Sequence, residues 1–229
     1  MSIPRSLTRI ATAVLIATAL FGSSLQIAVA HRGAASPAPA KVKKTANLIK
    51  NPGAESGNGS SNGSVVHIPN WTTTGATAVK YGATGGFPTA QTPGPPKRGT
   101  NFFAGGPHAA EDVESVMQTV ALNTYATKID AGKVKFTIAA WLGGSGSDAD
   151  SATVYLTFYS ASHTYLSGAT IGPLTSGDRN NVTKFLSRSK TASVPATARM
   201  VDIDVEFDGV SGTYNNAYVD NLSLILSGV

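Results

Sequence analysis

Apolar and polar residues alternate along much of the chain, in short segments that end at Gly, Pro, Asn, Asp or Ser. A period of two is typical of β-strands with one buried face, and no segment has the 3.6-residue period of a long helix. Thr124–Ala131 could form a single helical turn. The strands predicted by the alternation are Ser115–Leu122, Lys133–Leu142, Ala152–Ser160, Val182–Ser189, Ala198–Phe207 and Ala217–Leu226. Many regularly spaced strands predict an all-β chain, an antiparallel β-sandwich of jelly-roll type.

Two of these strands are predicted to turn aromatic side chains away from the core. In Lys133–Leu142 the even-numbered positions form an apolar face, so Trp141 lies on the opposite face. In Ala152–Ser160 the same parity places Tyr155 and Tyr159 outside. Aromatic rings beside hydrogen-bond acceptors suit a sugar, whose C–H faces stack on the rings. Alternatively, a loop covers these rings, or strand propensity alone explains them.

A row of acids is predicted on the outer face of Ala198–Phe207, where Asp202, Asp204 and Glu206 alternate with buried positions. A solvated face explains the row, whereas a glycosidase would need a carboxylate opposite it, such as Asp148 or Asp150. The sequence contains no HExxH motif, and Gly143–Gly146 is a Gly/Ser turn rather than a strand-to-helix nucleophile elbow, so zinc and serine hydrolases have little support.

Residues 1–46 are not expected to belong to the fold. A basic start, the apolar run Ile10–Phe21 and the Ala-Val-Ala at residues 28–30 predict a secretory signal peptide over residues 1–30, with an uncleaved membrane anchor as the alternative. Residues 31–46 are rich in Ala, Pro, Ser and Lys and are predicted to be a disordered linker. The mature protein is therefore expected to be one domain, residues 47–229, secreted or attached to the cell envelope and without a membrane span.

The net charge of +5 belongs to the N-terminal residues. Six of the 18 basic residues lie in residues 1–46, so residues 47–229 have 12 basic against 13 acidic residues and a net charge of −1. Nucleic-acid binding therefore loses its electrostatic basis. The lysines of the predicted linker could contact an anionic cell-surface polymer or simply keep the chain soluble. The absence of cysteine excludes thiol catalysis and thiolate metal sites.

The two ends of the predicted domain are expected to meet. Near its start, Asn47–Gly57 places an apolar pair before the turn formers Asn, Pro and Gly and then the carboxylate of Glu55. The last strand, Ala217–Leu226, has alternating leucines, and Asp220 stands where this alternation begins. We expect the first and last strands to pair and to bring Glu55 and Asp220 together at the rim of the sandwich.

Several motifs in this order resemble the galactose-binding-like jelly rolls found in carbohydrate-binding modules and in the sugar-binding region of glycoprotein-reading F-box proteins. The residues that carry the resemblance are Asn47–Gly57 (NLIKNPGAESG), Trp71, Asn101–Gly106 (NFFAGG), Trp141–Gly144 (WLGG) and Tyr218–Leu224 (YVDNLSL). The resemblance covers essentially all of residues 47–229. It implies a jelly-roll fold, but this fold hosts lectins, enzyme accessory modules and protein binders alike.

The resemblance also implies a structural calcium ion held by the glutamate of the opening motif and the aspartate of the closing motif. In this chain those residues are Glu55 and Asp220. Hard oxygen ligands and irregular loops suit Ca²⁺, and two carboxylates without a cation would repel each other or share a proton. Asn221 stands where many modules have a second aspartate, which lowers the charge of the site. The alternative is that Glu55 caps backbone amides and Asp220 forms a turn.

We therefore expect a secreted, non-catalytic module that binds a glycan or cell-surface polysaccharide. The predicted ligand-binding residues are Trp141, Tyr155, Tyr159, Tyr214 and Asn215. Tyr214 and Asn215 are included because they precede the last strand and are expected to lie in a loop. Two alternatives stay open: a structural or adhesion domain of the envelope that binds another protein, and an orphan glycoside hydrolase.

Overall fold

The structure, a computed structural model, describes residues 41–107 and 113–229. The predicted signal peptide and residues 31–40 of the predicted linker lie outside the described residues. In chain order the described elements are β1 (Thr72–Thr74), β2 (Thr77–Lys80), β3 (Asn101–Pro107), β4 (Val113–Ala121), the 3-10 turn η1 (Asn123–Tyr125), α1 (Ala126–Asp130), β5 (Lys135–Gly144), β6 (Ser151–Tyr159), β7 (Tyr165–Ile171), β8 (Lys184–Ser193), β9 (Met200–Asp208) and β10 (Tyr214–Ser227). The helical turn predicted at Thr124–Ala131 is confirmed. Within the described ranges no helix is both long and apolar enough to cross a membrane.

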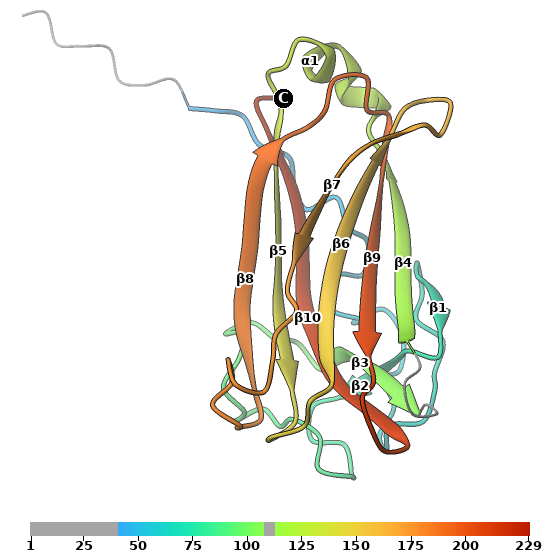
Figure 1. Ribbon diagram of the computed structural model, residues 1–229, viewed down its shortest axis with the longest axis vertical. Helices are drawn as coiled ribbons and strands as arrows, with labels where there is room; N and C mark the ends of the chain where they lie inside the picture. The colour runs from blue at the N-terminus through green and yellow to red at the C-terminus, as the bar shows by residue number, and fades with distance from the viewer. Residues whose placement is uncertain (1–40, 108–112) are drawn as a thin grey trace, which may run out of the picture. The chain divides into compact units, whose positions relative to one another are not determined.

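The strands form two five-stranded antiparallel sheets that face each other as a sandwich (Figure 1). One sheet, here called the β9 sheet, has the order β1-β4-β9-β6-β7. The other, the β10 sheet, has the order β2-β3-β10-β5-β8. Consecutive strands often lie in different sheets, as β5 and β6 do. The all-β antiparallel sandwich of jelly-roll type predicted from the alternation is confirmed.

The main core lies between the two sheets and follows the predicted parity. In β5, Phe136, Ile138, Ala140 and Leu142 point inward and are almost completely buried. In β9 the odd-numbered residues from Val201 to Phe207 are buried in the same way. Fully burying one such Leu, Ile or Phe side chain contributes about 1.5–3 kcal/mol. The sandwich is therefore stabilised mainly by these alternate positions.

The N-terminal segment and the last strand pair with each other, as predicted. The backbone N–H of Leu48 donates to the carbonyl of Leu224, and that of Thr45 donates to Leu226, each at 2.9 Å. Lys44 forms an isolated antiparallel bridge with Ser227. Residues 43–45, which the sequence analysis placed in the linker, are therefore hydrogen-bonded to the last strand. They bind there because β3 pairs only with the first part of β10 and leaves the backbone groups of its last part open on that side.

A second aromatic cluster lies on the outer face of the β10 sheet. Val79, Phe87, Phe102, Ala104, Phe185 and Tyr218 form it, and Tyr81, Ala83, Trp141 and Tyr214 pack against it. We call this group the outer cluster. The segment of residues 81–100 covers it and is held there by the backbone, since the N–H of Phe185 donates to the carbonyl of Pro93 at 2.8 Å. Only part of this outer face is therefore open to solvent.

Candidate functional site

The predicted stacking residues do not form one surface. Trp141 lies on β5 in the β10 sheet, whereas Tyr155 and Tyr159 lie on β6 in the β9 sheet. All three point away from the main core, but the outer faces of the two sheets of a sandwich look in opposite directions. The prediction that Trp141 has Tyr155 or Tyr159 as a neighbour is therefore wrong.

Asn215 and Tyr214 are built into the fold. β10 already begins at Tyr214, so neither residue lies in a loop. Asn215 is completely buried, and its Nδ2 donates to Glu114 Oε2 at 2.7 Å and to the carbonyl of Phe207 at 2.8 Å. Tyr214 packs edge-on against Phe87 with the ring centroids 5.3 Å apart. The expectation that Asn215 lies in a loop is wrong, and its amide instead joins the two sheets.

Trp141 is half-buried at the border between the outer cluster and the open part of the β10 sheet. Its register partners are Asp220 on β10 and Ser187 on β8. The covering segment is fixed beside it, because Nδ2 of Asn221 donates to the carbonyl of Lys97 at 2.9 Å. The indole is therefore held in place on one side and partly exposed on the other.

Beyond Trp141 the outer face of the β10 sheet has mostly small, hydroxyl-bearing side chains and ends at the exposed Lys135. By strand register its other members are Thr137, Ala139, Ser187, Ser189, Thr191, Ser193, Ser223, Ile225 and Ser227. The β8 members are exposed, and the β5 and β10 members are half-exposed. We call this surface the serine-threonine face. The hydroxyls of Thr137 and Thr191 lie 2.8 Å apart, so neighbouring strands offer paired donors and acceptors.

Glu55 and Asp220 lie close together, on either side of Gly53. A Cβ placed on Gly53 would lie 3.2 Å from Asp220 Oδ1 and 3.7 Å from Glu55 Cγ, so glycine leaves room for both acids. Glu55 accepts hydrogen bonds from the backbone N–H groups of Thr100 and Asn101 and from the Thr100 hydroxyl, at 2.7–3.1 Å. These bonds anchor the start of β3 to the opening motif.

Asp220 is a buried carboxylate with few partners. Tyr81 donates its hydroxyl to Oδ2 at 2.7 Å, and the Asn221 N–H donates to Oδ1 at 2.6 Å. Burial raises the pKa of Asp220 to about 7, an effect that these two hydrogen bonds oppose and that the charge of Glu55 adds to. Burial also raises the pKa of Tyr81, whose ring lies 4.9 Å below the guanidinium carbon of Arg98. Asp220 is therefore uncharged in a large share of the molecules near neutrality, and the charge of Arg98 favours its ionised form.

The donor chemistry of this pair is compatible with a hard cation, although the carboxylates are few. Glu55 and Asp220 together offer four carboxylate oxygens, and Asp220 is buried where an unneutralised charge is costly. The described residues contain no group of three or more His, Cys, Asp or Glu side chains that could hold a metal ion. Any cation here would thus need further oxygen ligands, such as backbone carbonyls or the Asn221 Oδ1, which would lie 3.5 Å from a Cβ on Gly53.

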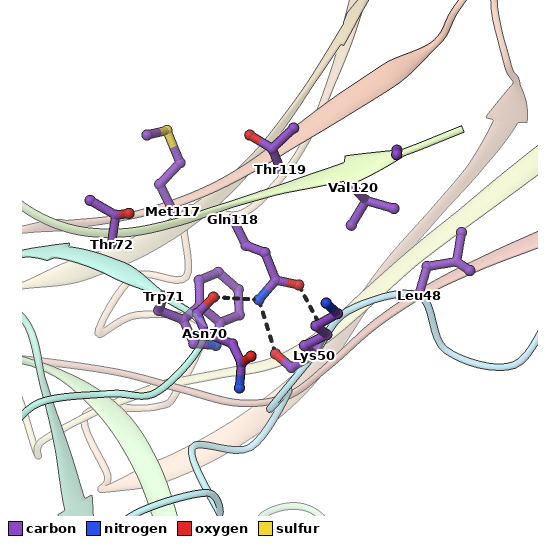
Figure 2. A pocket seen from close by; sticks show the side chains of 10 residues that line it. Leu48, Lys50, Asn70, Trp71, Thr72, Met117, Gln118, Thr119 and Val120 are labelled. Atoms are coloured by element: carbon purple, nitrogen blue, oxygen red, sulfur yellow. Dashed lines mark hydrogen bonds between the residues drawn. The ribbon is translucent and has the colours of Figure 1, made fainter. Parts of the chain in front are cut away.

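A groove that sequence reasoning missed lies beside β4, with a cavity volume of about 670 Å³ (Figure 2). Its floor is Gln118, which accepts a bond from the Lys50 N–H and donates to the carbonyls of Lys50 and Asn70, at 2.8–3.1 Å. Leu48 and Lys50 form one side, and Thr72 and Met117 border the other. The available sequence signal was Gln118 itself, a polar residue at an inward position among apolar ones.

Asp148 and Asp150, the acids that a glycosidase could set opposite the row on β9, both make hydrogen bonds within the fold. Asp150 is completely buried and accepts the backbone N–H groups of Val210 and Asn216 at 2.7–2.8 Å. Asp148 accepts the side-chain amide of Asn216 at 2.9 Å. Both acids therefore tie the loop before β6 to the start of β10.

Comparison with known proteins shows solved structures that are similar to this chain in fold. No family model and no curated protein matches the chain. Among solved structures, the enzymatically active domain of tailspike protein 4 of bacteriophage CBA120 is 15% identical, with a TM-score of 0.48 over 78% of this chain and 21% of that one, so the chain spans about a fifth of its length. A family 61 carbohydrate-binding module in complex with β-1,4-galactotriose is 14% identical, with a TM-score of 0.43 over 79% of this chain and 98% of the module.

A xylan-binding domain of carbohydrate-binding family 22 is 12% identical, with a TM-score of 0.39 over 71% of this chain and 90% of that domain. Carbohydrate-binding modules are thus among the solved structures that the chain resembles, as its motifs predict. The low identities and scores limit this resemblance to the fold.

Proposed function

We propose that the domain is a non-catalytic module that binds a carbohydrate on the outer face of the β10 sheet. The observation that supports the proposal most is the position of Trp141, whose partly exposed indole adjoins the serine-threonine face. An aromatic ring can stack on the C–H face of one sugar unit, while the hydroxyls beyond it hydrogen-bond to the next units. The shallow surface suits an extended glycan better than a single enclosed sugar.

The test is retention of the domain on immobilised or gel-embedded polysaccharides, with ligands first found on a glycan array. Trp141→Leu keeps an apolar side chain against the outer cluster but removes the stacking ring, so we expect it to lose retention while melting close to the wild-type temperature. Tyr155→Leu is the matched control, because Tyr155 is on the opposite sheet, and it should bind as wild type. Unchanged retention of Trp141→Leu would remove this face from the proposal.

We propose in addition that Glu55 and Asp220 hold a structural Ca²⁺. The support is their proximity across Gly53 and the burial of Asp220, which a cation would relieve. When bound, the ion would fix the opening motif to the last strand. Melting in Ca²⁺ should then exceed melting in chelator by several degrees, and Asp220→Asn should abolish the difference. Equal melting temperatures would remove calcium from the proposal.

We propose further that the protein acts outside the cell, either free or attached to the envelope. The support is the signal-like sequence of residues 1–30, which ends in a small-x-small cleavage motif. Expression of the full chain should yield a form in the medium or envelope fraction whose N-terminus is His31. Retention of the uncleaved chain in the cytoplasm would contradict secretion without affecting the glycan site.

A further inference from the structure

The edge of β4 is only partly covered by a neighbouring strand. β1 pairs with Ser115–Met117 and stops there, because the chain next to Thr72 turns inward to bury Trp71. β4 continues to Ala121, and on its other side β9 pairs with it along its whole length. Among residues 41–107 and 113–229, no strand therefore pairs with the last part of β4, from Gln118 to Ala121, on the β1 side.

Two hydrogen bonds show which backbone groups face this open edge. The N–H of Leu122 donates to the carbonyl of Arg199 at 2.8 Å, on the β9 side. The N–H of Ser115 donates to the hydroxyl of Thr74 at 3.1 Å, on the β1 side. Because successive residues of a strand turn their N–H and C=O groups to opposite sides, Thr119 and Ala121 present theirs to the open edge. These two residues lie about 6.8 Å apart along β4, the repeat of an extended polypeptide.

The groove in Figure 2 lies directly in front of these groups. Thr119, Val120 and Ala121 all line it, together with Leu48 and Lys50 across from them. Its volume of about 670 Å³ is enough for a short extended segment and falls in the range of preformed ligand sites. The three hydrogen bonds of Gln118 hold the two walls together, so the groove does not have to open before binding.

The side chains around the edge differ on its two faces. On the inner side, Leu48 and Val120 give an apolar wall. On the outer side, Met117 is 40% exposed and is paired in register with Asp204, while Thr119 is paired with Asp202. A long basic side chain on a strand added at this edge could cross β4 to reach these carboxylates, since neighbouring strands are about 4.8 Å apart.

We propose that this groove binds an extended peptide, which adds to the β9 sheet as a strand next to Thr119 and Ala121. The peptide would place apolar side chains on Leu48 and Val120 and basic side chains outward, toward Asp202 and Asp204. A peptide is favoured over a glycan because free backbone donors and acceptors at a two-residue repeat match another strand. The site is on a different sheet from Trp141 and does not depend on the proposed glycan binding.

The test uses a fluorescent six-residue peptide of alternating lysine and valine, with anisotropy as the readout. A second peptide carries N-methyl groups on the amides of one edge, and a third carries them on the other edge, so that charge and composition are kept. We expect one methylated edge to abolish binding and the other to leave it unchanged. Asp204→Asn should weaken binding several-fold and reduce its salt dependence.

The protein variants are Ala121→Pro and, as a control, Thr191→Val on strand β8 of the other sheet. Proline removes an N–H that points to the open edge, where a strand tolerates it, and should weaken binding by at least about tenfold, the effect of losing about 1.4 kcal/mol. Thr191→Val lies away from the groove and should bind the peptide as wild type. If Ala121→Pro does not fold, hydrogen exchange on the wild-type domain replaces it, and the amides of Thr119 and Ala121 should become protected when the peptide is added.

Several outcomes would overturn the proposal. Equal binding by the unmodified and both methylated peptides would show that charge alone attracts the lysines. Protection of Thr119 and Ala121 by an oligosaccharide but not by the peptide would assign the groove to a glycan. Trp141→Leu distinguishes the peptide site from the proposed glycan site, because this variant should lose glycan retention and keep peptide binding.

Discussion

Tyr81 donates a 2.7 Å hydrogen bond to the buried carboxylate of Asp220, which joins the covering segment of the outer cluster to the last strand. The same carboxylate lies beside Glu55 across Gly53. This contact therefore links the opening motif, the covering segment and β10, and it places an ionisable group where its charge state affects the stability of all three.

The first prediction concerns the pH dependence of stability without added metal. The folded-state pKa of Asp220, about 7, lies above the ordinary aspartate value of 3.8, because burial disfavours the charged form. Between these values the folded state holds a proton that the unfolded state has lost, so the contribution of Asp220 to stability is full below pH 4 and falls as pH rises toward 7. The loss is up to about 4 kcal/mol for a shift of this size. Urea unfolding in chelator from pH 4.5 to 8 measures it.

Asp220→Asn is the control for this dependence. Its side-chain oxygen can still accept from Tyr81, but it has no charge to bury, so the variant should be more stable than wild type at pH 8 and similar at pH 4.5. Adding Ca²⁺ should remove the fall of the wild-type protein if the proposed cation binds. If the free energy of unfolding depends on pH in the same way in wild type and in Asp220→Asn, the pH dependence does not come from Asp220.

The alternation of side chains predicted most of the sandwich, because a strand with one buried face repeats every two residues. β5 and β9 follow it closely, from Phe136 to Leu142 and from Val201 to Phe207. β3 was not predicted as a strand. All but its last residue are buried, so its sequence shows no alternation of apolar and polar residues. β7 was missed because Gly168 and its polar neighbours weaken the pattern.

The candidate site was less predictable, since parity separates inside from outside but does not say which sheet a strand joins. Trp141 and Tyr155 both point outward as predicted, yet they occupy opposite faces of the domain. Asn215 was misplaced because the last strand starts earlier than its alternation shows, and a bulge follows it. The approach of Glu55 to Asp220 could be expected because the motifs that carry them stand at the two ends of the domain.

The second prediction tests the structural role of Asn215. Asn215→Asp would place a carboxylate against Glu114, which accepts the asparagine amide at 2.7 Å, inside the protein. We expect the loss of two hydrogen bonds and the new repulsion to lower stability by about 3 kcal/mol or more. Thermal melting measures the effect, and glycan retention measured below the melting temperature should be unchanged. Loss of retention by a stably folded variant would return Asn215 to the binding site.

The third prediction concerns the extent of the glycan surface along β8. Ser189 is exposed on the serine-threonine face, where its register partner on β5 is Ala139. Ser189→Arg would lay a long side chain across this face and should weaken glycan binding by at least about tenfold, equivalent to about 1.4 kcal/mol. Thr157→Arg, on the outer face of the β9 sheet, is the matched control and should bind as wild type. If both variants bind equally well, the ligand does not extend along β8.

The fourth prediction concerns Arg179, which is completely buried and donates to backbone carbonyls, with no carboxylate bonded directly to it in the described part of the chain. Its guanidinium donates to the carbonyls of Gly146, Val182 and Asp148 at 2.8–3.1 Å and so holds the loop after β5 to the segment before β8. Burial lowers its pKa, an effect that the charge of Asp148 opposes. Arg179→Met would leave three carbonyls without their donor, and we expect a loss of about 3–5 kcal/mol in urea unfolding.

Gly144 tests the same arrangement from the opposite side. A Cβ on Gly144 would lie 2.8 Å from Arg179 Nη2, so Gly144→Ala must displace the guanidinium and should cost about 1–3 kcal/mol. Arg188→Met is the control, because Arg188 is more exposed and lies 3.6 Å from Asp178, and such a surface pair contributes at most about 1 kcal/mol. In Arg179→Met the effect of Gly144→Ala should shrink, since the group it displaces is gone. Additive losses in the double variant would show that Gly144 and Arg179 act independently.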